Sequence, residues 1–546
     1  ASLRPREASF IDLSAALVRR RRRLRTIAMV AAPLLLLGVL VGVRLSQSAA
    51  LAAVVDAHLR AANGLLEQAR ARDAEVVSDR ALAFSRFDVA DTEAAEQAWA
   101  RALAGVTELE GLYGLAAREL EAAHSRDSTR SDVRTLLGDV LEARALLAER
   151  GQDRAHVEDL VSRMHLHDES GERTARWTAP AELSLATTPA GAQVRLERYD
   201  RRANGRLVAS EPRELGLTPR QEPLPPGSYR LSFQLPGRPL VRYPLLVRRG
   251  EALRLDVSLP ATVPAGFVVV PAGRFLYGSA GDEDLRTGFY ATVPMHEVVT
   301  DAYVIAIHET TYADWIEFLE ALPPEQRSAW TPRGEAAAMR QGPSLQQRPD
   351  GAWQITTMVG TELQTTRVGE PLVRPARTVR AEQNWLRLPI TGLREEEAQA
   401  YMDWLDRSGR VPGARFCTEF EWERAARGAD GRYFPTGDDI GPDEANFDQT
   451  YDRDIAAMAP DEVGSFPASE SPSGLHDVMG NVYEFAATPG APSEKVVRGG
   501  AFFFGSLSGR SMNRNPIGPE FRDGTLGLRI CAPSPGVDAT MQRLND

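Results

Sequence analysis

Cysteine, lysine and net positive charge are scarce in this chain. Its 546 residues include two cysteines, Cys417 and Cys531, and one lysine, Lys495, among 64 basic residues. The shortage of lysine is typical of GC-rich codon usage and does not itself indicate a function for arginine. A net charge of −11 argues against nucleic-acid binding across the whole surface. An oxidising compartment would let the cysteines pair, whereas their apolar surroundings favour buried free thiols.

Proline is absent from residues 47–168, a stretch rich in Ala, Leu, Glu and Arg. Apolar residues recur there at helical spacing, and turn-like breaks occur at DVADT (88–92) and SRDSTRSD (125–132). We therefore predict an all-α domain or spacer over residues 46–170. The pair His165 and His167 could suggest a metal site, but residues two apart diverge on a helix, which favours solvated histidines.

Positive charge is concentrated at the amino end. Residues 1–44 hold nine arginines against Glu7 and Asp12, and five of the arginines, 19–23, are consecutive. The uncharged run TIAMVAAPLLLLGVLVGV (26–43) follows, with the length and flanking charge of a membrane span. We predict a cytoplasmic juxtamembrane segment (1–25) and a transmembrane helix (26–45).

A cleavable signal peptide is the alternative, and the long segment before the apolar run argues against it. Retention of arginine in the cytoplasm predicts a single-pass protein of the inner (cytoplasmic) membrane, with its later domains extracytoplasmic or periplasmic. Within the span, Gly38 and Gly42 form a G-x-x-x-G pair that allows close helix approach. This pair predicts a homodimer, with chance occurrence as the alternative.

The sequence changes to alternating apolar and polar residues near residue 178. Short alternating runs separated by Pro-Gly turns are typical of an antiparallel β module, which we place at 178–260. The segment 187–192 and LPPGSYRL (224–231) resemble the PEGA family, a small β-sandwich found outside bacterial membranes. The resemblance implies a structural or contact role.

The largest predicted domain spans 261–535, followed by a short tail (536–546). Its motifs are TEFEWERAARG (418–428), DVMGNVYEF (477–485), VVRGG (496–500) and GLRICA (527–532). Taken in this order, they resemble the formylglycine-generating, or sulfatase-modifying, family. The resemblance implies an α+β, C-type-lectin-like fold with many ordered loops, so the whole chain is predicted to be multidomain.

Active oxidases of that family carry two copper-binding cysteines. The first follows an R-G-G-S motif and two further residues, and the second lies five positions later. The resemblance carries these positions to Phe504 and Gly509, so no copper and no oxidase activity are expected. Phe504 is expected either to plug the old active site or to floor a hydrophobic pocket, and three adjacent phenylalanines favour the plug. Gly509 and Arg498 are assigned to the same pocket.

The resemblance also implies Ca²⁺. The family's site would use the Asp477 side chain, the Gly480 and Val482 carbonyls and the Glu484 carboxylate, an all-oxygen set that suits a hard cation. The alternative is that both carboxylates hydrogen-bond loop amides. A second site would use Asn446, the Phe447 carbonyl and, as the best candidate for its acid, Asp454.

These features together predict a membrane-anchored sensor with a catalytically inactive, ligand- or protein-binding domain. Bacterial transmembrane Ser/Thr kinases often carry such modules, and a kinase domain before Ala1 would explain why the chain does not begin with Met. One alternative is an enzyme with non-cysteine chemistry, such as an iron-dependent relative. The histidines of the helical region lack the H-x-x-x-H spacing that this would require. The other alternative is a purely structural periplasmic scaffold.

Overall fold

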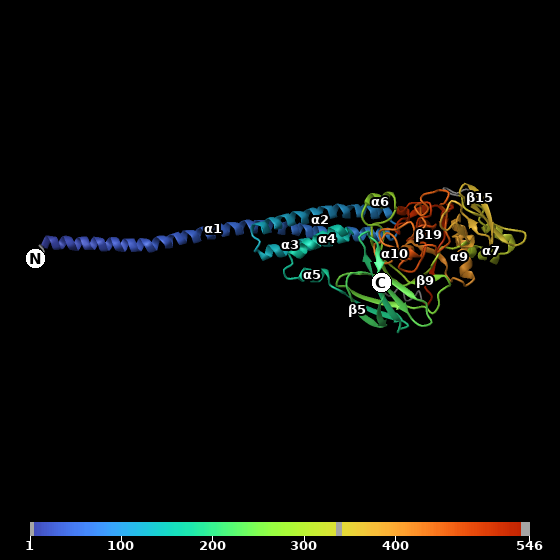
Figure 1. The fold of residues 1–546 in the computed structure, drawn as a ribbon, viewed down its shortest axis with the longest axis horizontal. Coiled ribbons are helices and arrows are strands. Elements are labelled where there is room, and N and C mark those ends of the chain that lie inside the picture. Colours follow the sequence, from blue (N-terminus) through green and yellow to red (C-terminus); the bar gives the residue numbers. More distant parts are fainter. Residues whose placement is uncertain (1–4, 335–340, 537–546) are drawn as a thin grey trace. The chain divides into compact units, whose positions relative to one another are not determined.

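A computed structural model describes residues 5–334 and 341–536 (Figure 1). The predicted tail therefore lies, beyond Gly536, outside the described residues. The chain forms two compact units. The first contains the residues up to Val77 together with Ala102–Arg173, and the second contains Ser78–Arg101 together with the residues from Thr174 onward. The predicted domain boundaries remain predictions, but the segment 78–101 belongs with the second unit.

Long helices build the first unit. They are α1 (Pro5–Phe87), α2 (Thr92–Arg126), α3 (Ser131–Arg150), α4 (Arg154–Leu166) and the start of α5 (Glu172–Trp177). The interruptions after Phe87 and Arg126 fall at the predicted breaks. Helices α1 and α2 run antiparallel, since Arg72 pairs with Glu108 at 2.8 Å and His58 with Glu119 at 2.6 Å.

Buried residues recur every seven positions along both helices of this pair. The positions on α1 are Val55, Ala62, Ala69 and Val76, and those on α2 are Ala102, Leu109, Ala116 and Ala123. A seven-residue repeat is the pattern of supercoiled helices, and alanine at the seam lets the two backbones approach closely. The seam explains why this alanine-rich sequence is stably helical.

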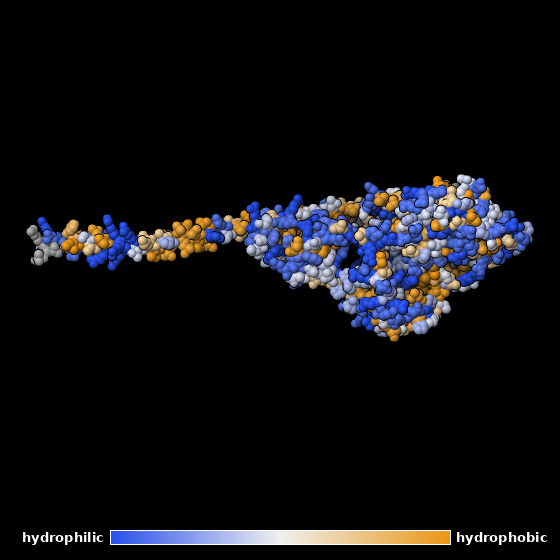
Figure 2. Space-filling view, in the orientation of Figure 1, coloured by the Kyte–Doolittle hydropathy of each residue, from blue (hydrophilic) through white to orange (hydrophobic). Residues whose placement is uncertain are grey.

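The amino-terminal part of α1 exposes its apolar side chains. Leu34, Leu35 and Leu36 are each more than 60% exposed, and Figure 2 shows a hydrophobic band along this part of the helix. Among the described residues, α1 is the one helix long and apolar enough to cross a membrane. The span and the helical region therefore share one continuous helix, where the sequence predicted two elements.

Two sheets occupy residues 181–258 of the second unit. In one, β1 (Ala181–Thr188) lies between β5 (Arg220–Leu224) and β8 (Ala252–Ser258); the other contains β2 (Gln193–Arg201), β3 (Leu207–Ala209), β4 (Arg213–Leu217), β6 (Gly227–Gln234) and β7 (Val241–Val247). Burial alternates along β1 and β6, as predicted. The expectation of purely antiparallel pairing is wrong, because β1 and β8 pair in parallel.

An eight-stranded sheet organises the rest of the second unit. Its order is β21-β20-β19-β18-β23-β12-β9, with β22 paired to β19. The bounds are β9 (Phe267–Val270), β12 (Tyr303–Ala306), β18 (Arg415–Thr418), β19 (Tyr483–Thr488), β20 (Ala491–Arg498), β21 (Asn515–Ile517), β22 (Leu526–Gly527) and β23 (Ile530–Pro533). Strands far apart in the sequence are thus neighbours.

Shorter elements surround this sheet. The strands are β10 (Gly273–Tyr277), β11 (His296–Thr300), β13 (Ser344–Gln347), β14 (Trp353–Val359), β15 (Glu362–Arg367), β16 (Leu372–Val373) and β17 (Glu382–Gln383). The helices are α6 (Glu283–Gly288), α7 (Tyr312–Ala321), α8 (Pro324–Trp330), α9 (Glu395–Arg407) and α10 (Glu419–Arg427), with 3₁₀ turns η1 (Trp385–Arg387), η2 (Pro467–Ser469) and η3 (Ser506–Gly509). Helix α10 begins with a reciprocal capping box between Thr418 and Glu421.

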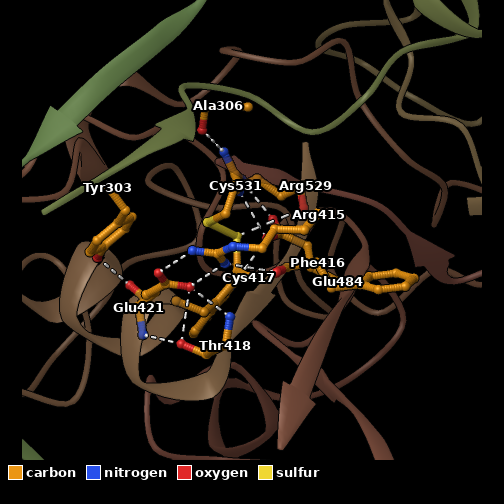
Figure 3. Close-up of a disulfide and its surroundings, with 11 residues drawn as sticks. Tyr303, Ala306, Arg415, Phe416, Cys417, Thr418, Glu421, Glu484, Arg529 and Cys531 are labelled. Carbon is orange, nitrogen blue, oxygen red and sulfur yellow. Dashed lines mark hydrogen bonds and ion pairs between the residues drawn. A yellow bond between two sulfur atoms is a disulfide. The ribbon is translucent and has the colours of Figure 1, made fainter. Parts of the chain in front are cut away.

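A disulfide joins Cys417 of β18 to Cys531 of β23 (Figure 3). The prediction of free thiols is therefore wrong. The two cysteines are 114 residues apart in the sequence. Strands β18 and β23 pair antiparallel with Cys531 opposite Arg415, and the Cα atoms of the two cysteines lie 4.8 Å apart. The apolar surroundings that were expected to hold free thiols therefore enclose a buried disulfide.

The tip of the α1–α2 hairpin packs on β11 and α6 within the second unit. His296 Nε2 lies 2.9 Å from an Asp88 carboxylate oxygen, and the His296 ring stacks on Phe84 at 4.6 Å. Trp99 Nε1 donates to Glu283, and Arg286 pairs with Glu96 at 2.8 Å. Polar and aromatic contacts therefore attach the end of α1 to the sheet-containing unit.

Candidate functional site

A cavity of about 370 Å³ opens beside the turn that follows β20. Its apolar walls come from β19, β20, β21 and the segments around them, and they include Phe289, Tyr483, Val497, Phe504, Ile517, Phe521 and Leu526. Its polar lining residues are Ser508, Asn513, Asn515 and Thr525. The residues that line this cavity are all uncharged, so the cavity suits an uncharged ligand.

Two glycines direct the chain from β20 to the cavity. Gly499 and Gly500 have φ values of +89° and +74°, which side chains other than glycine rarely adopt. A Cβ at Gly500 would lie 2.8 Å from the Cα of Gly509, so the chain crosses itself closely at this point. The tight turn sends Phe502 into the core, where it is 3% exposed, and leaves Phe504 half-buried.

Phe504 forms part of the cavity wall. Its ring packs edge-to-face against Tyr483 with centroids 5.3 Å apart, and against Phe503 at 5.8 Å. Open space remains beside the ring, so the structure favours the pocket-floor alternative over the plug. Burial raises the pKa of Tyr483 to about 12, so its phenol is neutral at physiological pH.

The other two predicted pocket residues do not line this cavity. A Cβ on Gly509 would lie 2.6 Å from the Met479 side chain, which fills the adjoining space. Arg498 is fully buried, and its guanidinium donates to Glu419, Glu423 and the Ser511 carbonyl. Met479 therefore fills the space beside Gly509, and Arg498 ties β20 to α10.

The expected calcium ligands of the first set engage protein partners. Asp477 is 3% exposed, and its Oδ2 accepts from the Gly464 amide at 2.6 Å. Both carboxylate oxygens of Glu484 accept from Arg529, at 2.6 and 2.8 Å. Trp422 Nε1 also donates to one of them. The charge of Glu484 is thus already neutralised by an internal cation.

Gly480 and Val482 lie in the same turn, where Gly480 approaches Asn446 too closely for any side chain. In the second set, Asn446 and Phe447 are buried, whereas Asp454 is exposed and accepts from the Ala456 amide. No cluster of three or more acidic, histidine or cysteine side chains suited to a metal occurs in 5–334 and 341–536. The predicted calcium sets use at most two carboxylates together with an asparagine and backbone carbonyls, so they remain predictions.

Burial changes the electrostatics next to this turn. Glu309 is 2% exposed, and burial together with the neighbouring Asp477 raises the pKa of its carboxyl well above the usual range. Asn481 donates to one of its oxygens at 3.1 Å. The interior beside the predicted calcium loop therefore disfavours additional negative charge.

Sequence reasoning missed several lining residues. Asn513 is 1% exposed, its Nδ2 donates to the Ser508 carbonyl at 2.8 Å, and its Oδ1 has no hydrogen-bond partner among the described residues. Tyr483 lies within DVMGNVYEF (477–485), the motif from which the first calcium site was predicted. Phe289 and Phe521 come from loops that meet only in three dimensions, so no local signal identifies them.

A second cavity, of about 570 Å³, lies between the hairpin tip and the edge of the main sheet. Phe87 and Ala90 line it from the tip, and Glu419 and Arg514, which pair at 2.7 Å, line it from the sheet side. Pro516 and Ile517 of β21 line both cavities. Strand β21 therefore separates the site at Phe504 from the end of α1.

The fold of the second unit is a loop-rich, C-type-lectin-like α+β architecture with one uncharged pocket beside an R-G-G turn. Residues 257–533, just over half of the chain, match the sulfatase-modifying factor enzyme 1-like domain. The chain belongs to this family. The predicted resemblance is thus confirmed.

Named relatives fall into three functional groups. The chain is 25% identical over 313 residues to the serine/threonine-protein kinase pkn1 of Chlamydia caviae, an alignment that covers 54% of this chain and 42% of the kinase. It is 28% identical to the inactive C-alpha-formylglycine-generating enzyme 2 of Mus musculus, covering 49% of this chain and 86% of that protein. It is 30% identical to the hercynine oxygenase of Mycolicibacterium smegmatis, and that alignment covers 45% of this chain and 52% of the oxygenase. The family therefore includes inactive members, kinases and oxygenases.

Proposed function

We propose that this chain is the membrane-anchored sensor region of a bacterial signalling protein, and that its family domain binds a ligand without oxidising it. The observation that carries the proposal is the altered site. Phe504, which the resemblance assigns to the first cysteine position, walls an uncharged cavity, and Met479 fills the space beside Gly509. Copper chemistry needs sulfur ligands that these positions lack.

The relatives support a signalling role. Kinases and an inactive enzyme are among the aligned proteins, although the chain spans only 42% of the kinase's length. We infer that the exposed apolar part of α1 spans the inner membrane with the arginine cluster on the cytoplasmic side. The domains after it are then extracytoplasmic, and Gly38 and Gly42 would mediate dimerisation of the span.

The position of strand β21, which lines both cavities of the second unit, supports the same proposal. A ligand beside Phe504 would contact β21, and β21 also lines the cavity that Phe87 closes from the other side. Phe87 is the last residue of α1, the helix that carries the apolar segment. Strand β21 therefore lies between the pocket and the last residue of α1 within the second unit.

The test is an oxidase assay on the full chain in detergent, loaded with copper and given a cysteine-containing sulfatase peptide. We expect no formylglycine product, while an active family member assayed in parallel should produce it. Formylglycine from this chain would overturn the proposal. Phe504→Ala should in addition cost less than the roughly 3–5 kcal/mol of a fully buried Phe, because the ring is a half-exposed wall.

A further inference from the structure

We propose that the proton on His296 controls how firmly the hairpin tip (residues 78–101) is attached to β11, so that the attachment strengthens as the pH falls. His296 lies on β11, and the tip contacts it through Phe84 of α1 and Asp88 of the following turn, all within the second unit. The attachment does not involve the cavity beside Phe504, so this role of His296 goes beyond the proposed ligand binding.

Both ring nitrogens of His296 face atoms that can only accept hydrogen bonds. Nδ1 lies 2.8 Å from the Pro294 carbonyl oxygen, and Nε2 lies 2.9 Å from an Asp88 carboxylate oxygen. A neutral imidazole carries one N–H group and one lone pair, whereas the protonated ring carries two N–H groups. Only the protonated ring can therefore donate to both oxygens at once.

The surroundings of the ring favour its positive charge. The ring stacks on Phe84 with planes 9° apart and centroids 4.6 Å apart, and cations are attracted to the faces of aromatic rings. Asp88 places a negative charge directly at the ring, whereas the guanidinium of Arg80 contacts Phe84, at 5.3 Å from its centroid. On β10, Tyr277 makes a T-shaped contact with the imidazole at 6.0 Å and stays neutral, because burial raises the pKa of its phenol. The charged group that touches the ring itself is therefore an acid.

Loss of the proton breaks the contact with the tip. Pro294 is buried, so a neutral ring keeps its one N–H group on Nδ1, because a buried carbonyl without a donor is costly. Nε2 then presents a lone pair to the Asp88 carboxylate, whose side chain is 39% exposed and can turn to water instead. Histidine side chains change charge between about pH 5 and 8. The attachment is therefore complete at the acidic end of this range and weakens as the pH rises.

Other contacts keep the tip in place when the ring is neutral. Arg286 pairs with Glu96 at 2.8 Å, and Trp99 Nε1 donates to Glu283 at 3.1 Å. The expected effect of deprotonation is therefore more frequent local opening of the tip, and not its separation from the unit. Amide hydrogen exchange measures such opening.

Hydrogen–deuterium exchange of the full chain in detergent tests the proposal. The amides to follow are those of residues 84–91, where Asp88, Ala90 and Asp91 donate to carbonyls at the end of α1. After correction for the intrinsic pH dependence of amide exchange, these amides should be about tenfold to a hundredfold less protected at pH 8.5 than at pH 5.5, the range that one charge-assisted hydrogen bond gives. The amides of α3, in the first unit, are the reference and should be equally protected at both pH values.

Asp88→Asn is the most informative variant, because its side-chain amide can accept from a protonated ring and donate to a neutral one. The pH-dependent change in protection should disappear in Asp88→Asn and in His296→Gln, whereas His165→Gln, at an exposed position of the first unit, should retain it. If His296→Gln fails to fold, Asp88→Asn still decides the point, since it leaves the imidazole in place. Equal protection of the unaltered chain at both pH values, or a change that persists in Asp88→Asn, would overturn the proposal.

Discussion

At the scale of the single residue, Gly509 lies so close to Met479 that no side chain fits without a shift. A Cβ at this position would lie 2.6 Å from Met479, so even alanine requires the methionine to move. We expect Gly509→Ala to lower the free energy of unfolding by about 1–3 kcal/mol, the usual cost of overpacking. In a Met479→Ala background the same substitution should cost nothing further. Gly111→Ala, where the added methyl meets open space on α2, is the control and should be neutral or stabilising.

The buried carboxyl group of Glu309 predicts that the stability of the folded chain depends on pH. Its pKa is raised by burial and by Asp477, so the folded chain holds this proton more tightly than the unfolded chain does. Stability from this group is therefore complete below the ordinary glutamate pKa and declines as the pH rises toward the folded value. Glu309→Gln should remove that decline. The melting temperature of the variant should exceed that of the unaltered chain by more at pH 8 than at pH 5, and an equal difference at both values would contradict the assignment.

At the scale of the element, the turn between Asp477 and Glu484 is stabilised by internal contacts. Arg529 supplies the positive charge that a calcium ion would bring to Glu484, and the Gly464 amide engages Asp477. We therefore expect a calcium chelator to leave the melting temperature of the full chain unchanged. A lower melting temperature with chelator, lost in Asp477→Ala, would instead establish the calcium site that the sequence predicted.

The disulfide between β18 and β23 is the second element-scale feature. It closes a loop of 114 residues, and removing such a bond typically costs about 2–5 kcal/mol. Cys417→Ala combined with Cys531→Ala should lower the free energy of unfolding by that amount. Disulfides persist in extracytoplasmic compartments, so the chain isolated from its membrane should resist thiol alkylation until it is reduced. Free thiols in the native membrane would argue for a cytoplasmic location.

Local features of these elements could be predicted from the sequence. The breaks after Phe87 and Arg126, the acidic start of α9 and the capping box of α10 depend on neighbouring residues alone. The Cys417–Cys531 pairing depends on strands that are 114 residues apart. The cavity depends on how the loops that carry Asn513 and Phe521 fold back toward Tyr483, so no local pattern identified these residues. The sequence also contains the seven-residue repeat of the seam between α1 and α2. The repeat was not recognised because most of its positions are alanine, which is only weakly hydrophobic.

For the whole molecule, the position of the arginine cluster predicts orientation. The amino-terminal end of α1 should be cytoplasmic and the second unit exposed on the other side. Protease added to intact spheroplasts should therefore degrade the second unit, whereas an epitope fused before Pro5 should be protected until the membrane is opened. Protection of the second unit in intact cells would reverse the proposed orientation.

The unbroken course of α1 fixes a rotational phase between its two ends. Its 83 residues extend for about 125 Å, and each residue turns the helix by about 100°. Within the first unit, the direction in which Val76 of the seam faces α2 and the direction in which Gly38 points are therefore fixed relative to each other. A continuous helix transmits rotation about its axis as well as movement along it. The angular position of its residues therefore matters more for such transmission than the length of the helix. Related chains with longer rods should then have gained residues in multiples of seven, since each such insertion returns the seam to within about 20° of its original direction.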